Sequence, residues 1–171
     1  MRTKVLKGPE HYLYLAFLTS LAYVFFMKFI FQEVWGYSPF ATELVEGMSS
    51  IVPMIRYLKK WHEYRAYWGI FYSIFWIISP IFLALGFLAT RVLDEKYLTA
   101  YKKQSKGKFY LAGFAVFCFC AFLFIVPGGG NRFWLNELSD NLIIISITLL
   151  QMAGCIFGLG FFIGVARLKL N

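Results

Sequence analysis

The stretch YWGIFYSIFWIISPIFLALGFLAT, residues 67–90, contains no charged side chain and decides the class of this protein. A helix needs about 20 apolar residues to cross a hydrocarbon layer that is about 30 Å thick. This stretch reaches that length, and in lipid its backbone groups must hydrogen-bond within the segment itself. Residues 67–90 are therefore predicted to form a transmembrane helix.

Three further stretches are also long and apolar, at about residues 12–31, 109–126 and 142–166, and Lys28 is the one charged side chain within them. Of the 171 residues, 60% are hydrophobic and 15% are charged, whereas a soluble domain is about half apolar and about a quarter charged. We therefore predict an all-α polytopic membrane protein, a single domain over residues 1–171 with four transmembrane helices. The first is expected to be retained rather than cleaved as a signal peptide, because its apolar run exceeds a typical signal core.

Lysine and arginine predict how these helices are oriented, because cytoplasmic loops are enriched in them. Five basic residues fall on one predicted side of the membrane: Arg56, Lys59, Lys60, Arg65 and Arg132. Eleven fall on the other side: Arg2, Lys4, Lys7, Arg91, Lys96, Lys102, Lys103, Lys106, Lys108, Arg167 and Lys169. Both termini and residues 91–108 are therefore predicted to face the cytoplasm, and the loops of residues 32–66 and 127–140 to face outside.

The end of the long outer loop carries a helical pattern of apolar residues, which predicts an interfacial helix at about residues 51–64. One interpretation is an amphipathic helix that meets a partner at the outer face, and the other is a solvated first turn of the second transmembrane helix. The apolar positions follow helical spacing at Ile51, Met54, Ile55, Leu58 and Trp61. Ile55, Leu58 and Trp61 are the candidate contacts.

The last apolar stretch contains two pairs of glycines, each pair four residues apart. The pairs are Gly154 with Gly158 and Gly160 with Gly164. The missing side chains let two helices approach closely. Three interpretations stay open: packing inside the bundle, a homodimer, or a groove that faces a toxin. Gln151 belongs to the same stretch, and its amide is expected to need a hydrogen-bond partner there.

The sequence offers little catalytic chemistry. Its two histidines, His11 and His62, fall on opposite sides of the predicted membrane, so they cannot share a metal ion. Cys118 and Cys120 are two residues apart in a helix and point to roughly opposite faces, and Cys155 lies in another apolar stretch. This pattern excludes a quinone-linked thiol oxidoreductase, which needs cysteine pairs in loops near the outer face. We predict that the protein is not an enzyme and uses no cofactor or metal.

The layout resembles the four-helix immunity proteins that act against pore-forming colicins of the A and B type. The likeness covers the length, the four helices, the cytoplasmic termini, the long first outer loop and the basic cytoplasmic loop. Local similarities are SSIVP at residues 49–53 and GGG at residues 128–130. The resemblance implies a multi-pass protein of a bacterial inner membrane that binds a membrane-inserted toxin and stops its channel from opening. It assigns no functional residue.

Other functions are compatible with the same pattern. Entry-exclusion proteins of F-like conjugative plasmids are similar in kind and would bind a membrane-held transfer component. A small transporter or channel subunit is disfavoured, because the stretches carry no inward row of ionisable residues. A subunit of a larger membrane complex stays open, as does the oligomeric state. The predicted partners are the lipid bilayer and another membrane protein, with no nucleic acid, because the basic residues flank apolar stretches.

Overall fold

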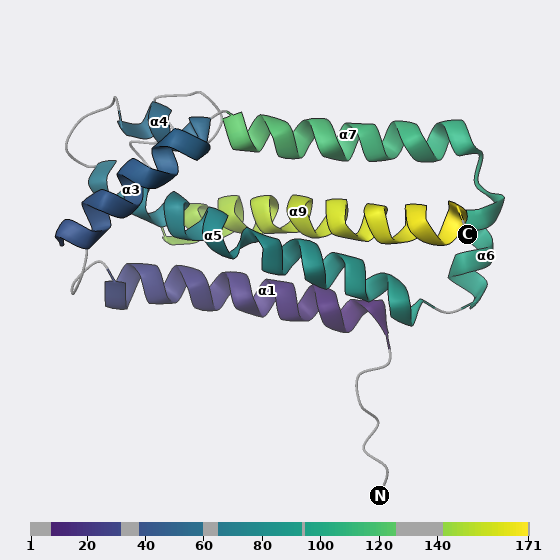
Figure 1. The fold of residues 1–171 in the computed structure, drawn as a ribbon. Coiled ribbons are helices and arrows are strands. Elements are labelled where there is room, and N and C mark those ends of the chain that lie inside the picture. The colour runs from purple at the N-terminus through teal and green to yellow at the C-terminus, as the bar shows by residue number, and fades with distance from the viewer. Residues whose placement is uncertain (1–7, 32–37, 60–64, 94, 126–141, 171) are drawn as a thin grey trace, which may run out of the picture.

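The computed structural model describes residues 8–31, 38–59, 65–93, 95–125 and 142–170, and all regular elements among them are helices (Figure 1). The all-α prediction is confirmed for these residues. In chain order the helices are α1 (Pro9–Phe25), η1 (Phe26–Phe31), α3 (Pro39–Ile51), α4 (Pro53–Lys59), α5 (Arg65–Ala89), η2 (Thr90–Val92), α6 (Glu95–Lys103), α7 (Lys106–Ile125) and α9 (Leu142–Leu170).

Within the described residues, three helical segments are long and apolar enough to cross a membrane: Pro9–Phe29, Gly69–Val92 and Leu149–Leu168. They overlap three of the four predicted stretches. This overlap supports the prediction that the chain is a membrane protein. The remaining predicted stretch, residues 109–126, lies almost wholly within the apolar helix α7. Its last residue, Val126, is outside the described residues.

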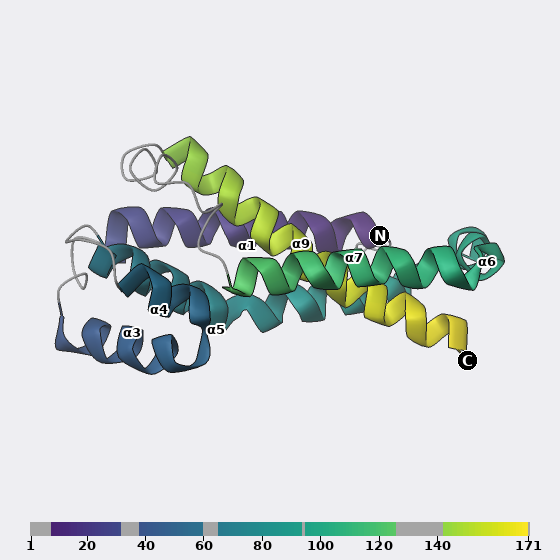
Figure 2. The same cartoon turned by 90° about the horizontal axis from the view of Figure 1, so that it is seen from above.

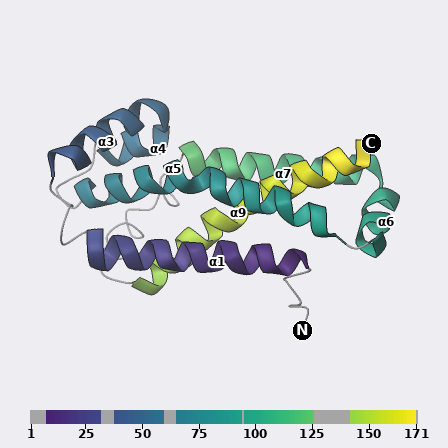
Figure 3. The same cartoon turned by 60° about the horizontal axis from the view of Figure 1, so that its bottom comes forward.

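Helix α9 is the centre of the bundle, because it contacts α1, α5 and α7. Its course is oblique, so that its first half lies beside α1 and its second half approaches the C-terminal end of α5 (Figures 2 and 3). Helices α7 and α9 separate toward the end where α9 begins. Helix α9 is therefore covered on one face and less covered on another.

The two ends of the bundle are built differently. The start of α1, the whole of α6 and the end of α9 lie at one end, and α3 and α4 lie at the other (Figure 1). Helix α6 runs across the long axes of the other helices (Figures 1 and 2). If the long helices cross a bilayer, α6 lies in the plane of its surface.

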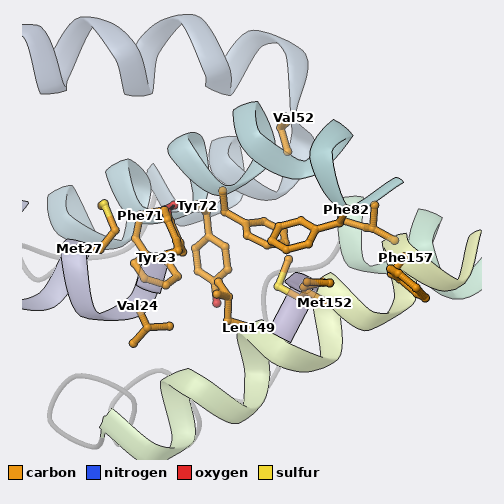
Figure 4. Packing of buried hydrophobic residues seen from close by; sticks show 14 of the residues in the cluster. Tyr23, Val24, Met27, Val52, Phe71, Tyr72, Phe82, Leu149, Met152 and Phe157 are labelled. Carbon is orange, nitrogen blue, oxygen red and sulfur yellow. Dashed lines mark hydrogen bonds between the residues drawn. The ribbon is translucent and has the colours of Figure 1, made fainter. Parts of the chain in front are cut away.

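Aromatic side chains form the core between α1, α5 and α9. Tyr23 of α1 packs its ring against Phe71 of α5, with centroids 5.1 Å apart, and donates its hydroxyl to the Phe71 carbonyl. Phe75 and Phe82 of α5 are fully buried and stack on each other. Leu149, Met152 and Phe157 of α9 close this core from the other side (Figure 4).

Helix α5 continues through Pro80, where the sequence predicts a local disturbance. Proline has no N–H, so the carbonyl of the residue four positions earlier, Trp76, loses its usual helical donor. The Ser79 hydroxyl donates to that carbonyl at 2.8 Å. The serine before the proline thus satisfies the acceptor that the proline leaves open, as polar side chains do in membrane helices.

The segment predicted as a long outer loop contains a helix that the spacing of its residues could have indicated. Helix α3 begins where the Ser38 side chain accepts a hydrogen bond from the Ala41 N–H, and Pro39 fills its first turn. Its inward residues, Ala41, Leu44, Val45 and Met48, follow helical spacing. No helix was predicted here, because a short amphipathic helix has no long apolar run.

The predicted interfacial helix at about residues 51–64 has different boundaries in the structure. Ile51 ends α3, Val52 takes an extended conformation, and α4 begins at Pro53. Arg56 of α4 donates from its Nε to the Ser49 carbonyl at 3.1 Å and from its Nη2 to the Ser50 carbonyl at 3.2 Å. This guanidinium satisfies carbonyls at the end of α3 and complements its dipole. Residues 60–64 are outside the described residues.

Candidate partner-binding face on helix α9

The two glycine pairs of α9 have opposite environments. An added Cβ on Gly160 would overlap the carbonyl oxygen of Leu83 on α5, and one on Gly86 of α5 would overlap the carbonyl oxygen of Phe157 on α9. Gly164 is also closed, because a Cβ there would collide with the side chain of Thr90. Gly160 and Gly164 therefore permit the close approach of α9 to α5.

Gly154, which is exposed, and Gly158, which is partly buried, lie on another side of the same helix. An added Cβ at either position would meet nothing within 4 Å. At 3.6 residues per turn, Gly158 is about 160° around the helix from Gly160. Gln151 is exposed on the same side, one turn before Gly154 and Cys155. We call the surface formed by Gln151, Gly154 and Gly158 the α9 groove.

Gln151 is the polar group of the α9 groove. It lies about 13 Å from the start of α9, at 1.5 Å per residue, and the residues before it are apolar except Ser146 and Thr148. Its side chain makes no hydrogen bond to another residue in the described parts of the chain. An amide has two donors and an acceptor and is costly to leave unpaired in hydrocarbon. Gln151 is therefore suited to bond to a partner in the membrane.

Helix α7 packs on α9 next to the groove, at Cys155 and Phe162, which lie three residues before and four residues after Gly158. Phe109 of α7 stacks on Phe162 of α9 with ring centroids 4.7 Å apart, and Gly113 leaves room for the same ring. Farther along α7, the thiol of Cys120 donates to the Cys155 carbonyl with a sulfur–oxygen distance of 3.4 Å. Most other described α7 side chains are exposed apolar groups, as expected where a helix faces lipid.

The three cysteines are free thiols with different surroundings. Cys118 is exposed, whereas Cys120 lies at the seam against Cys155 of α9. This agrees with the expectation that Cys118 and Cys120 point to different faces of their helix. In the described parts of the chain, no three metal-binding side chains of His, Cys, Asp or Glu come together.

The candidate contacts from the outer loop are placed apart from the α9 groove. Ile55 of α4 is 0% exposed and joins the core together with Val52 and Met54. The side chain of Leu58 and the whole of Trp61 are outside what the structure describes. Helix α4 packs on α5 and α7, so Ile55 contributes to the packing of this end of the bundle.

Sequence reasoning identified the residues of the groove but not which of them face outward. All four glycines and Gln151 were candidates, and the structure divides them between a closed face and an open one. Comparison with protein-family models, curated proteins and solved structures gave no match for this chain.

Proposed function

We propose that this protein is a non-enzymatic, multi-pass protein of the bacterial inner membrane that protects its cell by binding a pore-forming bacteriocin in the bilayer. The α9 groove is the observation that carries the proposal. It combines two glycines with open space beside them and one exposed amide on a helix able to span a membrane. Small residues that let backbones approach, together with an amide donor, favour association of helices in lipid.

The proposed topology has four crossings, by α1, α5, α7 and α9, with both termini in the cytoplasm. The start of α1, helix α6 and the end of α9 lie at one end of the bundle, which agrees with a shared side for these segments (Figure 1). Among the five basic residues on the opposite side, Arg56 is engaged by the carbonyls of Ser49 and Ser50. Arg56 therefore has a structural role at the end of α3. This role explains the presence of one of the five basic residues on the side where the proposed orientation expects few.

In the proposed mechanism, an apolar helix of the inserted toxin lies along the α9 groove. Close approach at Gly154 and Gly158 gives van der Waals contact, while the Gln151 amide hydrogen-bonds to a polar group of the toxin helix. Toxin helices must rearrange in the bilayer to open a channel. A helix that is held against α9 cannot complete that rearrangement, so the membrane potential is preserved.

Protection of living cells tests this function. Cells that express the protein are challenged with colicins A and B and with any pore-forming toxin encoded beside its gene, and they are expected to survive concentrations that kill empty-vector cells. The double variant Gly154→Leu with Gly158→Leu should lose protection, because leucine side chains fill the groove. Gly47→Leu is the matched control, since Gly47 of α3 also has nothing within 4 Å of an added Cβ. It should keep protection.

Two results would overturn the proposal. Cells that die like empty-vector cells with every toxin would remove the immunity function. If the same cells become poor recipients in a mating assay, the function is entry exclusion instead. Full protection by the double variant, at equal amounts of protein in the membrane, would place toxin binding away from the α9 groove.

A further inference from the structure

The end of the bundle formed by α6 has a geometry suited to a membrane surface. Helix α6 lies across the axes of the long helices (Figures 1 and 2). It is held there by Tyr101, whose ring meets Phe161 of α9 edge-on with centroids 6.2 Å apart. Tyr97, one turn earlier, is 54% exposed. Tyrosine is enriched at the level of lipid headgroups because its ring is apolar and its hydroxyl is polar.

This end also carries exposed positive charge. Residues 91–108 contain six basic and two acidic residues. Among the side chains that the structure describes, Arg91, Lys103, Lys106, Lys108 and Arg167 are exposed cations. Arg91 is held near the bundle with its guanidinium carbon 5.8 Å from the centre of the Phe87 ring.

The chain supplies few described carboxylates for these cations. Glu10 is at this end, and one of its oxygens lies 3.9 Å from the Nδ1 of its neighbour His11. Glu43 and Glu46 are on α3, at the opposite end of the bundle. In the described parts of the chain, none of the five cations forms an ion pair with a carboxylate. With six basic and two acidic residues in positions 91–108, this end of the chain keeps a net positive charge that attracts an external anion.

We propose that α6 and the five cations around it form a binding surface for anionic phospholipid headgroups. The phosphates meet Lys103, Lys106 and Lys108, while Tyr97 lies among the headgroups. Clusters of basic residues next to membrane helices attract anionic lipids, and each residue strengthens the attraction. The surface holds this end of the bundle at one leaflet, and it does not depend on the function proposed for the α9 groove.

Lipid titration of the purified full chain in detergent tests the surface. Phosphatidylglycerol, added to mixed micelles, should raise the thermal unfolding midpoint, whereas phosphatidylcholine should not. The triple variant Lys103→Gln, Lys106→Gln and Lys108→Gln should weaken the apparent affinity for phosphatidylglycerol roughly 10- to 100-fold. Raising NaCl toward 1 M should reduce the wild-type effect, because it shortens the screening length to about 3 Å.

Two matched variants make the test specific to α6. Arginine at the same three positions keeps the charge and should keep the effect. The variant Lys59→Gln, Lys60→Gln and Arg65→Gln removes the same number of charges elsewhere and should also keep it. Equal effects of both lipids, or an equal loss in the two glutamine variants, would overturn the proposal. So would a full effect of inorganic phosphate without lipid, which would indicate a site for free phosphate.

Discussion

The first and second glycine pairs of α9 are alike in sequence and opposite in structure. Gly160 and Gly164 face α5, where added side chains would collide with Leu83 and Thr90, whereas Gly154 and Gly158 face open space. The pairs are offset by six residues, which turns one about 240° from the other around the helix. A pair of small residues therefore indicates a side of a helix that another helix can approach closely. Whether a helix of the same chain already packs on that side depends on the arrangement of the bundle.

The largest expected effect concerns the closed pair. Gly160→Leu should destabilise the fold by about 3 kcal/mol or more, because the leucine must displace the backbone of α5. Unfolding by SDS titration in detergent measures this change. Gly158→Leu is the control and should alter stability by less than about 1 kcal/mol, since no atom of the described residues lies within 4 Å of a Cβ added there. Equal stability of the two variants would contradict the contrast.

A smaller effect is expected at the polar position of the open face. Gln151→Leu should weaken protection against the toxin roughly fivefold, which corresponds to about 1 kcal/mol for a hydrogen bond between membrane helices. The minimum lethal toxin concentration measures it. Thr19→Leu on α1 is the control. The Thr19 hydroxyl already donates to the Leu15 carbonyl of the same helix at 2.8 Å, so it is not needed by a partner. Unchanged protection with Gln151→Leu would mean that the amide does not contact the toxin.

Two alanine variants sharpen the comparison within the closed pair. Gly164→Ala should cost about 1 kcal/mol, because the Thr90 side chain must move away from its bond to the Phe87 carbonyl. Gly160→Ala should cost more, since the obstacle there is the Leu83 backbone. Both are compared with wild type in the same SDS titration. A larger loss for Gly164→Ala would show that the Thr90 side chain, rather than the Leu83 backbone, limits how closely α9 approaches α5.

Much of the fold could be predicted from the long apolar runs alone. In lipid, the backbone groups of such a run must be hydrogen-bonded internally, which favours a helix. Helix α3 was not predicted, although Ser38 and Pro39 mark its start and Ala41, Leu44 and Val45 mark its inner face. The segment that forms α6 was predicted as a basic loop, because it also lacks a long apolar run. Short helices that lie across the ends of a bundle need no long apolar run.

The candidate site was predictable in its residues but not in its orientation. The spacing of Gly154, Gly158, Gly160 and Gly164 identified α9 as a helix that others approach. Which pair faces α5 depends on the rotation of α9 within the bundle. That rotation is set by contacts between distant segments, such as Gly160 with Leu83, which no local pattern encodes.

Site-specific photocrosslinking tests the central claim most directly. A benzophenone amino acid is placed at Gln151 in the α9 groove, and separately at Leu18 of α1 and Phe114 of α7, which are exposed apolar positions outside it. Membranes are then irradiated with the inserted toxin present. We predict a toxin adduct from position 151 and none, or much less, from positions 18 and 114. Adducts from positions 18 and 114 with none from position 151 would contradict binding at the α9 groove.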